Sequence, residues 1–349
     1  MQTTAADIEK IPAGMLRVGY RIAFAIGAFL ACITVLNALA RWAEGPDYLA
    51  DWQNEIDRAG QAEVAVLGPS IAQHIYPQAM CQQGINLAGA GEDIFESEAL
   101  IMHLHEDGNL PKLVIIGLFP GLFESDNGAD GTHRSYRRIY AYRNLQARGD
   151  WRLIGNDWQG AVRALAFPAL GYDQWQGRFR LIRDRLAKRN SIFEDPAFSQ
   201  QQLTSSQQDV QQTKRFLSKR DNELASMRQH DVSISERAQK AVLRINALLA
   251  ANDSRLLLVT MPAGPAMSAA APTALADDLV QLAERDTEFR AAGVLTINDL
   301  TTTDFSRVLN GFRDPIHFNR DGGMRYSRDL AQRLAARGLL PQPDCAIPS

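Results

Sequence analysis

The sequence has little excess charge of either sign, which limits the class of partner. Its 349 residues include 37 basic and 40 acidic side chains, so the formal net charge is -3. A domain that neutralises nucleic-acid phosphates is usually clearly basic, and we therefore exclude nucleic acid as a partner. The hydrophobic share of 46% and the charged share of 22% are ordinary for a globular protein of one large domain or two small ones.

Cysteine is also scarce, and its spacing indicates no metal site. The three cysteines are Cys32, Cys81 and Cys345, and none forms a zinc-type pattern with a histidine. Cys32 lies within an apolar N-terminal segment, whereas Cys81 and Cys345 follow it. Those two could pair in an oxidising compartment, but the sequence leaves their pairing open.

A long uncharged run, residues 22–40, lies near the N-terminus. As a helix that rises about 1.5 Å per residue it would be ~28 Å long, close to the hydrocarbon thickness of a bilayer. Basic residues precede the run and acidic residues follow it: Lys10, Arg17 and Arg21 before, then Glu44, Asp47 and Asp51. The positive-inside bias predicts a single-pass protein of the cell inner membrane, with residues 1–21 cytoplasmic and the main domain periplasmic.

Two other interpretations of this run stay open. Ala38-Leu39-Ala40 has the small-x-small pattern of a signal-peptidase site, although the apolar run is longer than in a typical cleaved signal. A buried core helix could be equally apolar, but the terminal position and the flanking charges favour an anchor.

The rest of the chain alternates short apolar runs with amphipathic segments. Residues 41–62 read as a polar helical stalk, and residues 63–349 as one domain. Five buried strands are predicted: residues 63–67, 113–118, 255–260 and 294–298, and a short apolar element within residues 84–91. Helices are predicted over 93–104, 273–292 and 323–336, and Ser233 with Glu236 fits a capping box before a helical stripe over 238–249. The residues 262–265, Pro-Ala-Gly-Pro, read as a turn that closes the strand 255–260. Between about 124 and 232 the strand pattern stops, which indicates a helical insertion. This alternation predicts an α/β fold with about five mostly parallel strands, covered by helices on both faces.

Two polar stretches fall at corresponding places in this pattern. Ser70 follows the first strand, and Asp314-Pro-Ile-His317 lies in the connection after the last strand. Because the carboxyl ends of parallel strands meet at one edge of a sheet, we expect the three side chains at that edge. A histidine oriented by a carboxylate can remove the proton of a serine hydroxyl, so the set predicts a nucleophilic serine site.

These residues resemble the motifs of a known superfamily. Gly68-x-Ser70 after the first strand, Asn86-Leu-Ala-Gly89 after the second and Asp314-x-x-His317 before the last helix are similar to those of SGNH (GDSL-type) esterases and acyltransferases. The resemblance covers residues 63–123 and 232–336. It is closest to membrane-anchored members that modify cell-surface polymers, such as the alginate O-acetyltransferase and teichoic-acid D-alanylation families.

The resemblance implies a flavodoxin-like three-layer sandwich and a role for each residue. Ser70 would be the nucleophile, His317 the base and Asp314 its orienting partner, with oxyanion donors from the backbone N–H groups of Ser70 and of Gly89 or Gly91. It implies an esterase or O-acyltransferase acting on acyl groups, most simply acetyl, of a cell-surface or secreted polysaccharide. No metal or organic cofactor is required. An acyl donor would have to be supplied across the membrane, which implies an integral membrane acyltransferase partner.

The sequence departs from the family pattern in two places. The usual Gly-Asp-Ser is Gly68-Pro69-Ser70, and the Gly-x-Asn expected after the third strand is Gly117-Leu118-Phe119-Pro120. The missing asparagine favours an alternative, a non-catalytic component of a polysaccharide or envelope assembly complex that keeps the fold. Taken alone, Ser70 after Gly-Pro is more often a helix N-cap than a nucleophile. The histidines His74, His103, His105 and His133 have no evident partners and are interpreted as structural or solvated.

Overall fold

The computed structural model describes residues 13–89, 91–121, 206–228, 234–301 and 309–341. Within them, the strands form a five-stranded parallel sheet in the order β2-β1-β3-β4-β5. Flavodoxin-like sheets have this order, and their ligands bind beyond the carboxyl ends of the strands. The predicted α/β fold with five parallel strands is confirmed. The strands are β1 (Val64–Leu67), β2 (Gly84–Asn86), β3 (Leu113–Leu118), β4 (Arg255–Thr260) and β5 (Leu295–Asn298).

Burial on both faces explains why the central strands are continuous apolar runs. Every residue of β1 and β3 is buried, and so is every residue of β4 after Arg255. Successive side chains of a strand point to opposite faces. Val64 and Val66 therefore join one hydrophobic cluster, whereas Ala65 and Leu67 join the other.

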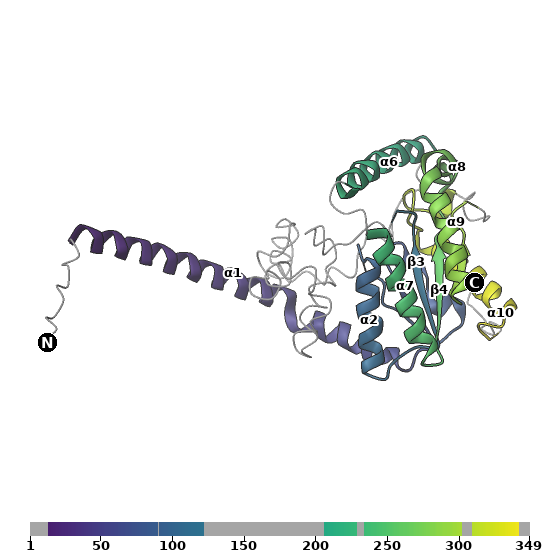
Figure 1. Cartoon of the computed structure of the whole chain (residues 1–349), viewed down its shortest axis with the longest axis horizontal. Coiled ribbons are helices and arrows are strands. Elements are labelled where there is room, and N and C mark those ends of the chain that lie inside the picture. The colour runs from purple at the N-terminus through teal and green to yellow at the C-terminus, as the bar shows by residue number, and fades with distance from the viewer. Residues whose placement is uncertain (1–12, 90, 122–205, 229–233, 302–308, 342–349) are drawn as a thin grey trace, which may run out of the picture.

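Helices cover both faces of the sheet (Figure 1). The helices α2 (Ile94–Glu106) and α7 (Ile234–Ala250) lie side by side on the face of Ala65 and Leu67. On the opposite face lie α8 (Pro265–Ala274), α10 (Arg320–Ala336) and two short 3₁₀ helices, η1 (Ala72–His74) and η2 (Pro77–Met80). The helix α9 (Ala276–Ala291) contacts β5 at the edge of the sheet.

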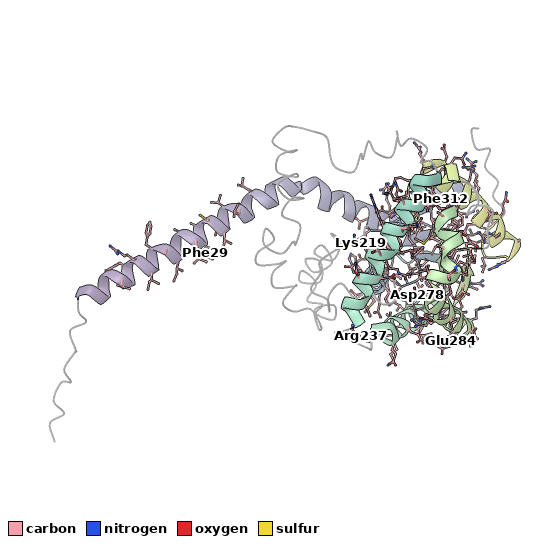
Figure 2. All side chains as sticks on the ribbon, turned by 90° about the horizontal axis from the view of Figure 1, so that it is seen from above. Phe29, Lys219, Arg237, Asp278, Glu284 and Phe312 are labelled. Carbon is pink, nitrogen blue, oxygen red and sulfur yellow. The ribbon has the colours of Figure 1, made fainter. Side chains whose placement is uncertain are left out.

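The N-terminal segment is one uninterrupted helix, α1 (Ala13–Ala59), so the predicted anchor and the predicted stalk are continuous. Its window Val18–Leu36 is long and apolar enough to cross a membrane. Most side chains of this window are exposed, Phe24 by 79% and Phe29 by 64%, and Figure 2 shows Phe29 on the part of the helix that lies far from the domain. A buried core helix is thereby excluded, and a membrane anchor or a signal sequence remains.

Several predicted boundaries differ from the structure. The sequence placed a turn around Pro265 and a helix from about Thr273, whereas the chain forms α8 from Pro265 and then α9. Pro265 occupies the first turn of α8, where its missing N–H costs nothing. The closing helix α10 begins at Arg320, because the Asn319 side chain accepts the Gly322 N–H at 2.8 Å and caps it.

The predicted insertion is described only in part. Its residues 124–205 and 229–232 lie outside the described residues, and so does the predicted helix cap at Ser233. Within it, α6 (Ser206–Arg228) lies beside α8, and Arg220 of α6 donates to Asp278 of α9 at 3.1 Å. Cys81 is disulfide-bonded, Cys32 is free in α1, and Cys345 lies outside the described residues.

Candidate active site

Ser70 stands on a turn that only glycine permits. The turn begins at Gly68, directly after β1, with φ of 109°, a conformation that side chains rarely adopt. A Cβ on Gly68 would lie 2.5 Å from the Gly117 carbonyl oxygen of β3. A Cβ on Gly117 would lie 2.7 Å from that of Ala72, so this pair of glycines lets the turn and η1 sit directly on the sheet.

The turn of Asp314 and His317 is closed by local hydrogen bonds. It follows η7 (Leu309–Gly311) and precedes α10. The Arg313 N–H donates to the His317 carbonyl at 2.8 Å, and the Asp314 carboxylate accepts the N–H groups of Ile316 and His317 at 3.1 and 2.8 Å. From outside, the Gly264 N–H after β4 donates to the Pro315 carbonyl at 2.8 Å. The turn is thereby tied to the carboxyl end of the sheet.

Aromatic packing supports this turn from behind. Phe312 and Phe318 flank it and stack with ring centroids 4.5 Å apart, and Phe318 packs on Tyr326 of α10 at 5.3 Å. The Tyr326 hydroxyl donates to Asp299 at 2.8 Å, and Arg333 binds both oxygens of the same carboxylate. Because Asp299 follows β5, this buried network joins α10 to the sheet edge.

The structure brings Ser70, His317 and Asp314 together in one line. The Ser70 Oγ lies 2.8 Å from His317 Nε2, and His317 Nδ1 lies 2.9 and 2.8 Å from the two Asp314 carboxylate oxygens. An ionised carboxylate can only accept, so the ring proton belongs on Nδ1 and leaves Nε2 to accept from the serine hydroxyl. This is the geometry of an activated serine, although the catalytic roles stay predictions.

The electrostatics of the turn keep Asp314 ionised. Burial alone would raise the pKa of this carboxyl, but the hydrogen bond and charge of His317 and the two backbone N–H groups together lower it to about 2. Arg313 adds a cation, with its Nε 3.7 Å from the Asp314 carboxylate. At neutral pH the carboxylate is therefore charged and can stabilise an imidazolium on His317.

His74 is the neighbour of His317 that sequence reasoning missed as part of the site. It is buried in η1, and its ring meets that of His317 edge-on with centroids 6.0 Å apart. Burial, aided by the charges of His317 and Arg313 and opposed by Asp314, lowers the pKa of His74 to about 3. The ring is thus neutral across the physiological range. The available clue was that His74 lies only four residues after Ser70 in the sequence.

The predicted oxyanion donors differ in their availability. No hydrogen bond from the Ser70 N–H is found within the described residues. The Gly89 N–H already donates to the Gly68 carbonyl at 2.9 Å, so it would have to exchange that bond to act as an oxyanion donor. Gly91 has φ of 72°, which suits a turn rather than an extended loop.

After β3, where the family pattern has asparagine, the side chain is Phe119. It is buried and meets Phe216 of α6 edge-on, with centroids 5.9 Å apart. The insertion therefore packs on the end of β3 through an aromatic contact. Neither phenylalanine side chain carries an N–H or O–H group, so this contact gives no hydrogen-bond donor in the place of the asparagine.

A second carboxylate, Asp209 of α6, lies near the site and was not predicted. It is buried and accepts the Ala266 N–H of α8 at 3.1 Å, so it caps a helix that has glycine at its own cap position. Burial raises the pKa of Asp209; the Ala266 bond lowers it and the charge of Asp314 raises it. No local pattern marks such a contact, because its partner is 57 residues away.

No family model matches the chain, and no curated protein matches it significantly.

Proposed function

We propose that the protein is a membrane-anchored serine esterase or O-acyltransferase that acts on acyl groups, most simply acetyl, of a cell-surface or secreted polysaccharide. The observation that carries the proposal is the continuous hydrogen-bonded line from Ser70 through His317 to Asp314. A line of this kind activates a hydroxyl, because the imidazole can take the proton while the carboxylate stabilises the resulting cation. The motifs that resemble the SGNH superfamily support it.

The reaction would proceed in two steps, acylation of Ser70 and then transfer of the acyl group to water or a sugar. In the first, Ser70 Oγ attacks the acyl carbonyl carbon, its proton moves to His317 Nε2, and the alcohol of the donor ester leaves with that proton. In the second, water or a sugar hydroxyl attacks the acyl-serine, His317 takes its proton, and Ser70 Oγ leaves and is reprotonated. Water as the second nucleophile gives hydrolysis, whereas a sugar hydroxyl gives transfer.

The proposed setting follows from α1. As a membrane anchor, its window Val18–Leu36 would hold the domain at the inner membrane, and the charge bias would place it in the periplasm. The disulfide-bonded Cys81 suits that oxidising compartment. A transferase there would need an activated acyl group from an integral membrane acyltransferase partner, because a single span cannot form a transport path.

A non-catalytic component of a polysaccharide or envelope assembly complex is the second candidate. Phe119 in place of the usual asparagine and the occupied Gly89 N–H favour it. An oxyanion donor is worth about 10²–10³ in rate, so a chain without its full set could keep the fold as a binding surface alone.

Labelling of Ser70 distinguishes the two candidates. The full-length protein in detergent would be treated with a fluorophosphonate probe and assayed for acetate release from a chromogenic acetyl ester, beside Ser70→Ala. Catalysis predicts covalent labelling at Ser70 and turnover that Ser70→Ala abolishes. If labelling and turnover are absent, or are equal in wild type and Ser70→Ala, the result would support the non-catalytic component. Assay with an acetylated polysaccharide, with and without a second sugar acceptor, would separate hydrolysis from transfer.

A further inference from the structure

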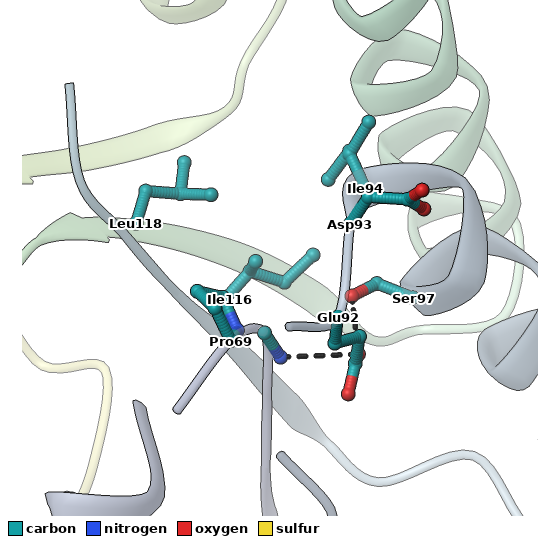
Figure 3. Close-up of a pocket in the computed structure, with 8 residues that line it drawn as sticks. Pro69, Glu92, Asp93, Ile94, Ser97, Ile116 and Leu118 are labelled. Carbon is teal, nitrogen blue, oxygen red and sulfur yellow. Dashed lines mark hydrogen bonds between the residues drawn. The ribbon is translucent and has the colours of Figure 1, made fainter. Parts of the chain in front are cut away.

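The carboxylate of Glu92 holds the turn that carries Ser70. Its Oε1 accepts the N–H of Gly68 at 3.2 Å and the hydroxyl of Ser97 at 2.6 Å, as the dashed lines in Figure 3 mark. The Glu92 side chain is only 3% exposed. Burying a carboxylate is costly unless hydrogen bonds compensate it, and these two contacts supply that compensation at Oε1.

Both the N–H and the carbonyl of Gly68 are hydrogen-bonded to the segment that runs from Gly89 to Glu92. Its N–H donates to Glu92, and its carbonyl accepts the N–H of Gly89 at 2.9 Å. The Glu92 N–H in turn donates to the Gly89 carbonyl at 3.2 Å, which closes a turn with Gly91 at φ of 72°. The two ends of this turn therefore clamp the residue at which β1 leaves the sheet.

The position of Glu92 is itself rigid. It directly precedes Asp93, the N-cap of α2, whose side chain accepts the Glu96 N–H at 2.9 Å while Glu96 accepts the Asp93 N–H at 3.0 Å. This capping box fixes the start of α2. Ser97, in the same first turns, supplies the second donor to Glu92. The clamp on Gly68 is thus anchored to a helix packed on the sheet.

Pro69 links the clamped Gly68 to Ser70, so the position of Gly68 affects the position of the serine. The proline ring fixes its own φ, which removes one of the backbone rotations between the clamped peptide and the serine. Without the clamp, the positive φ of Gly68 could relax, because glycine populates both signs of φ about equally. Ser70 Oγ would then leave the position 2.8 Å from His317 Nε2.

We propose that Glu92 is a positioning residue of the Ser70 site, which fixes the nucleophile turn by accepting the Gly68 N–H. The inference rests on the proposed function, since it concerns how the Ser70 hydroxyl is presented for acylation. The hydrogen bond from the Gly68 N–H places the action of Glu92 at Gly68, two residues before Ser70.

Paired substitutions test this role. Glu92→Leu keeps a similar volume but removes the acceptor, whereas Glu92→Gln keeps an oxygen that can accept from Gly68. We expect Glu92→Leu to slow fluorophosphonate labelling of Ser70 and kcat for the acetyl ester about 10- to 100-fold, because small displacements of a reacting group cost this much. KM should change little, and Glu92→Gln should restore most of the rate.

A stability control separates positioning from general damage to α2. Asp93→Ala removes the cap of the same helix without touching Gly68. It should lower the melting temperature as Glu92→Leu does, yet label Ser70 at close to the wild-type rate. Equal labelling by wild type and Glu92→Leu would overturn the inference, as would equal slowing by Asp93→Ala and Glu92→Leu.

Amide hydrogen exchange at Gly68 makes the inference independent of turnover. Exchange should be faster in Glu92→Leu than in wild type and Glu92→Gln. If wild-type Ser70 is never labelled, the proposed function fails. The clamp is then judged by exchange alone, and equal Gly68 exchange in wild type and Glu92→Leu overturns it.

Discussion

Ser70 Oγ and His317 Nε2 lie 2.8 Å apart although 247 residues separate them in the chain. Parallel topology explains the meeting, since every strand delivers the chain to the same edge of the sheet. Close packing of α10 on η1 also brings the two residues together. A Cβ on Gly323, in the first turn of α10, would lie 2.6 Å from the His74 carbonyl oxygen, so the glycine lets α10 approach η1. The Ser327 hydroxyl of α10 then accepts the Tyr76 N–H at 2.8 Å.

Asp314→Asn should remove turnover while leaving the turn folded. An asparagine oxygen can still accept the N–H groups of Ile316 and His317, but its amide no longer holds the His317 proton on Nδ1. We expect kcat for an acetyl ester to fall about 10²- to 10⁴-fold, as for an orienting carboxylate of a serine triad. The control is Asp321→Asn, an equal charge change at an exposed position of α10. Equal losses in both variants would refute an orienting role.

The same carboxylate should make stability depend on pH in acid. The pKa of Asp314 is about 2 in the folded protein against an ordinary 3.8, so the unfolded chain binds the proton first as pH falls. Its stabilisation is complete above about pH 4 and is lost between there and pH 2. We expect about 1–2 kcal/mol, since the side chain is 32% exposed. Denaturant unfolding from pH 6 to 2 should show a flatter curve for Asp314→Asn than for wild type.

His74 should contribute a second acid transition at higher pH. Its folded pKa of about 3 lies below the ordinary 6.5, so the unfolded state binds the extra proton between these values. Stability should therefore fall as pH drops from about 6.5 toward 3, by an amount on the order of a few kcal/mol. His74→Phe keeps a ring beside His317 and cannot titrate. Unfolding free energies for this variant that still fall as steeply as those of wild type would contradict the prediction.

Gly68→Ala tests the strained turn beneath Ser70. The substitution combines a positive φ with a Cβ that would meet the Gly117 carbonyl, so we expect a loss of about 2–4 kcal/mol of unfolding free energy and of Ser70 labelling. Gly108→Ala is the matched control, because Gly108 has φ of 70° but open space around it. It should cost about 1 kcal/mol and leave labelling intact. Chemical unfolding measures the loss of unfolding free energy in both variants. Similar losses would show that the positive φ alone, and not the contact with the Gly117 carbonyl, sets the cost.

Local pattern was sufficient for the framework of this protein. A run such as Leu113–Leu118 can be continuously apolar only where both faces are covered, so its composition already predicts a central parallel strand. Alternation of such strands with helical segments then places Ser70 and the Asp314 turn at one edge. Helix boundaries were less accessible, because Pro265 reads as a turn and begins a helix only where its neighbours allow it.

Tertiary structure alone decided how the site is held. The Gly68 bond to Glu92, the capping of α8 by Asp209 and the burial of His74 beside His317 join polar groups that are distant in sequence or lack any period. Buried faces of strands and helices produce apolar residues at regular intervals along the chain, so they can be predicted from the sequence. A single hydrogen bond between remote segments produces no such periodic pattern. The sequence by itself therefore determined the fold and the edge that bears Ser70, and packing decided which polar groups hold and surround it.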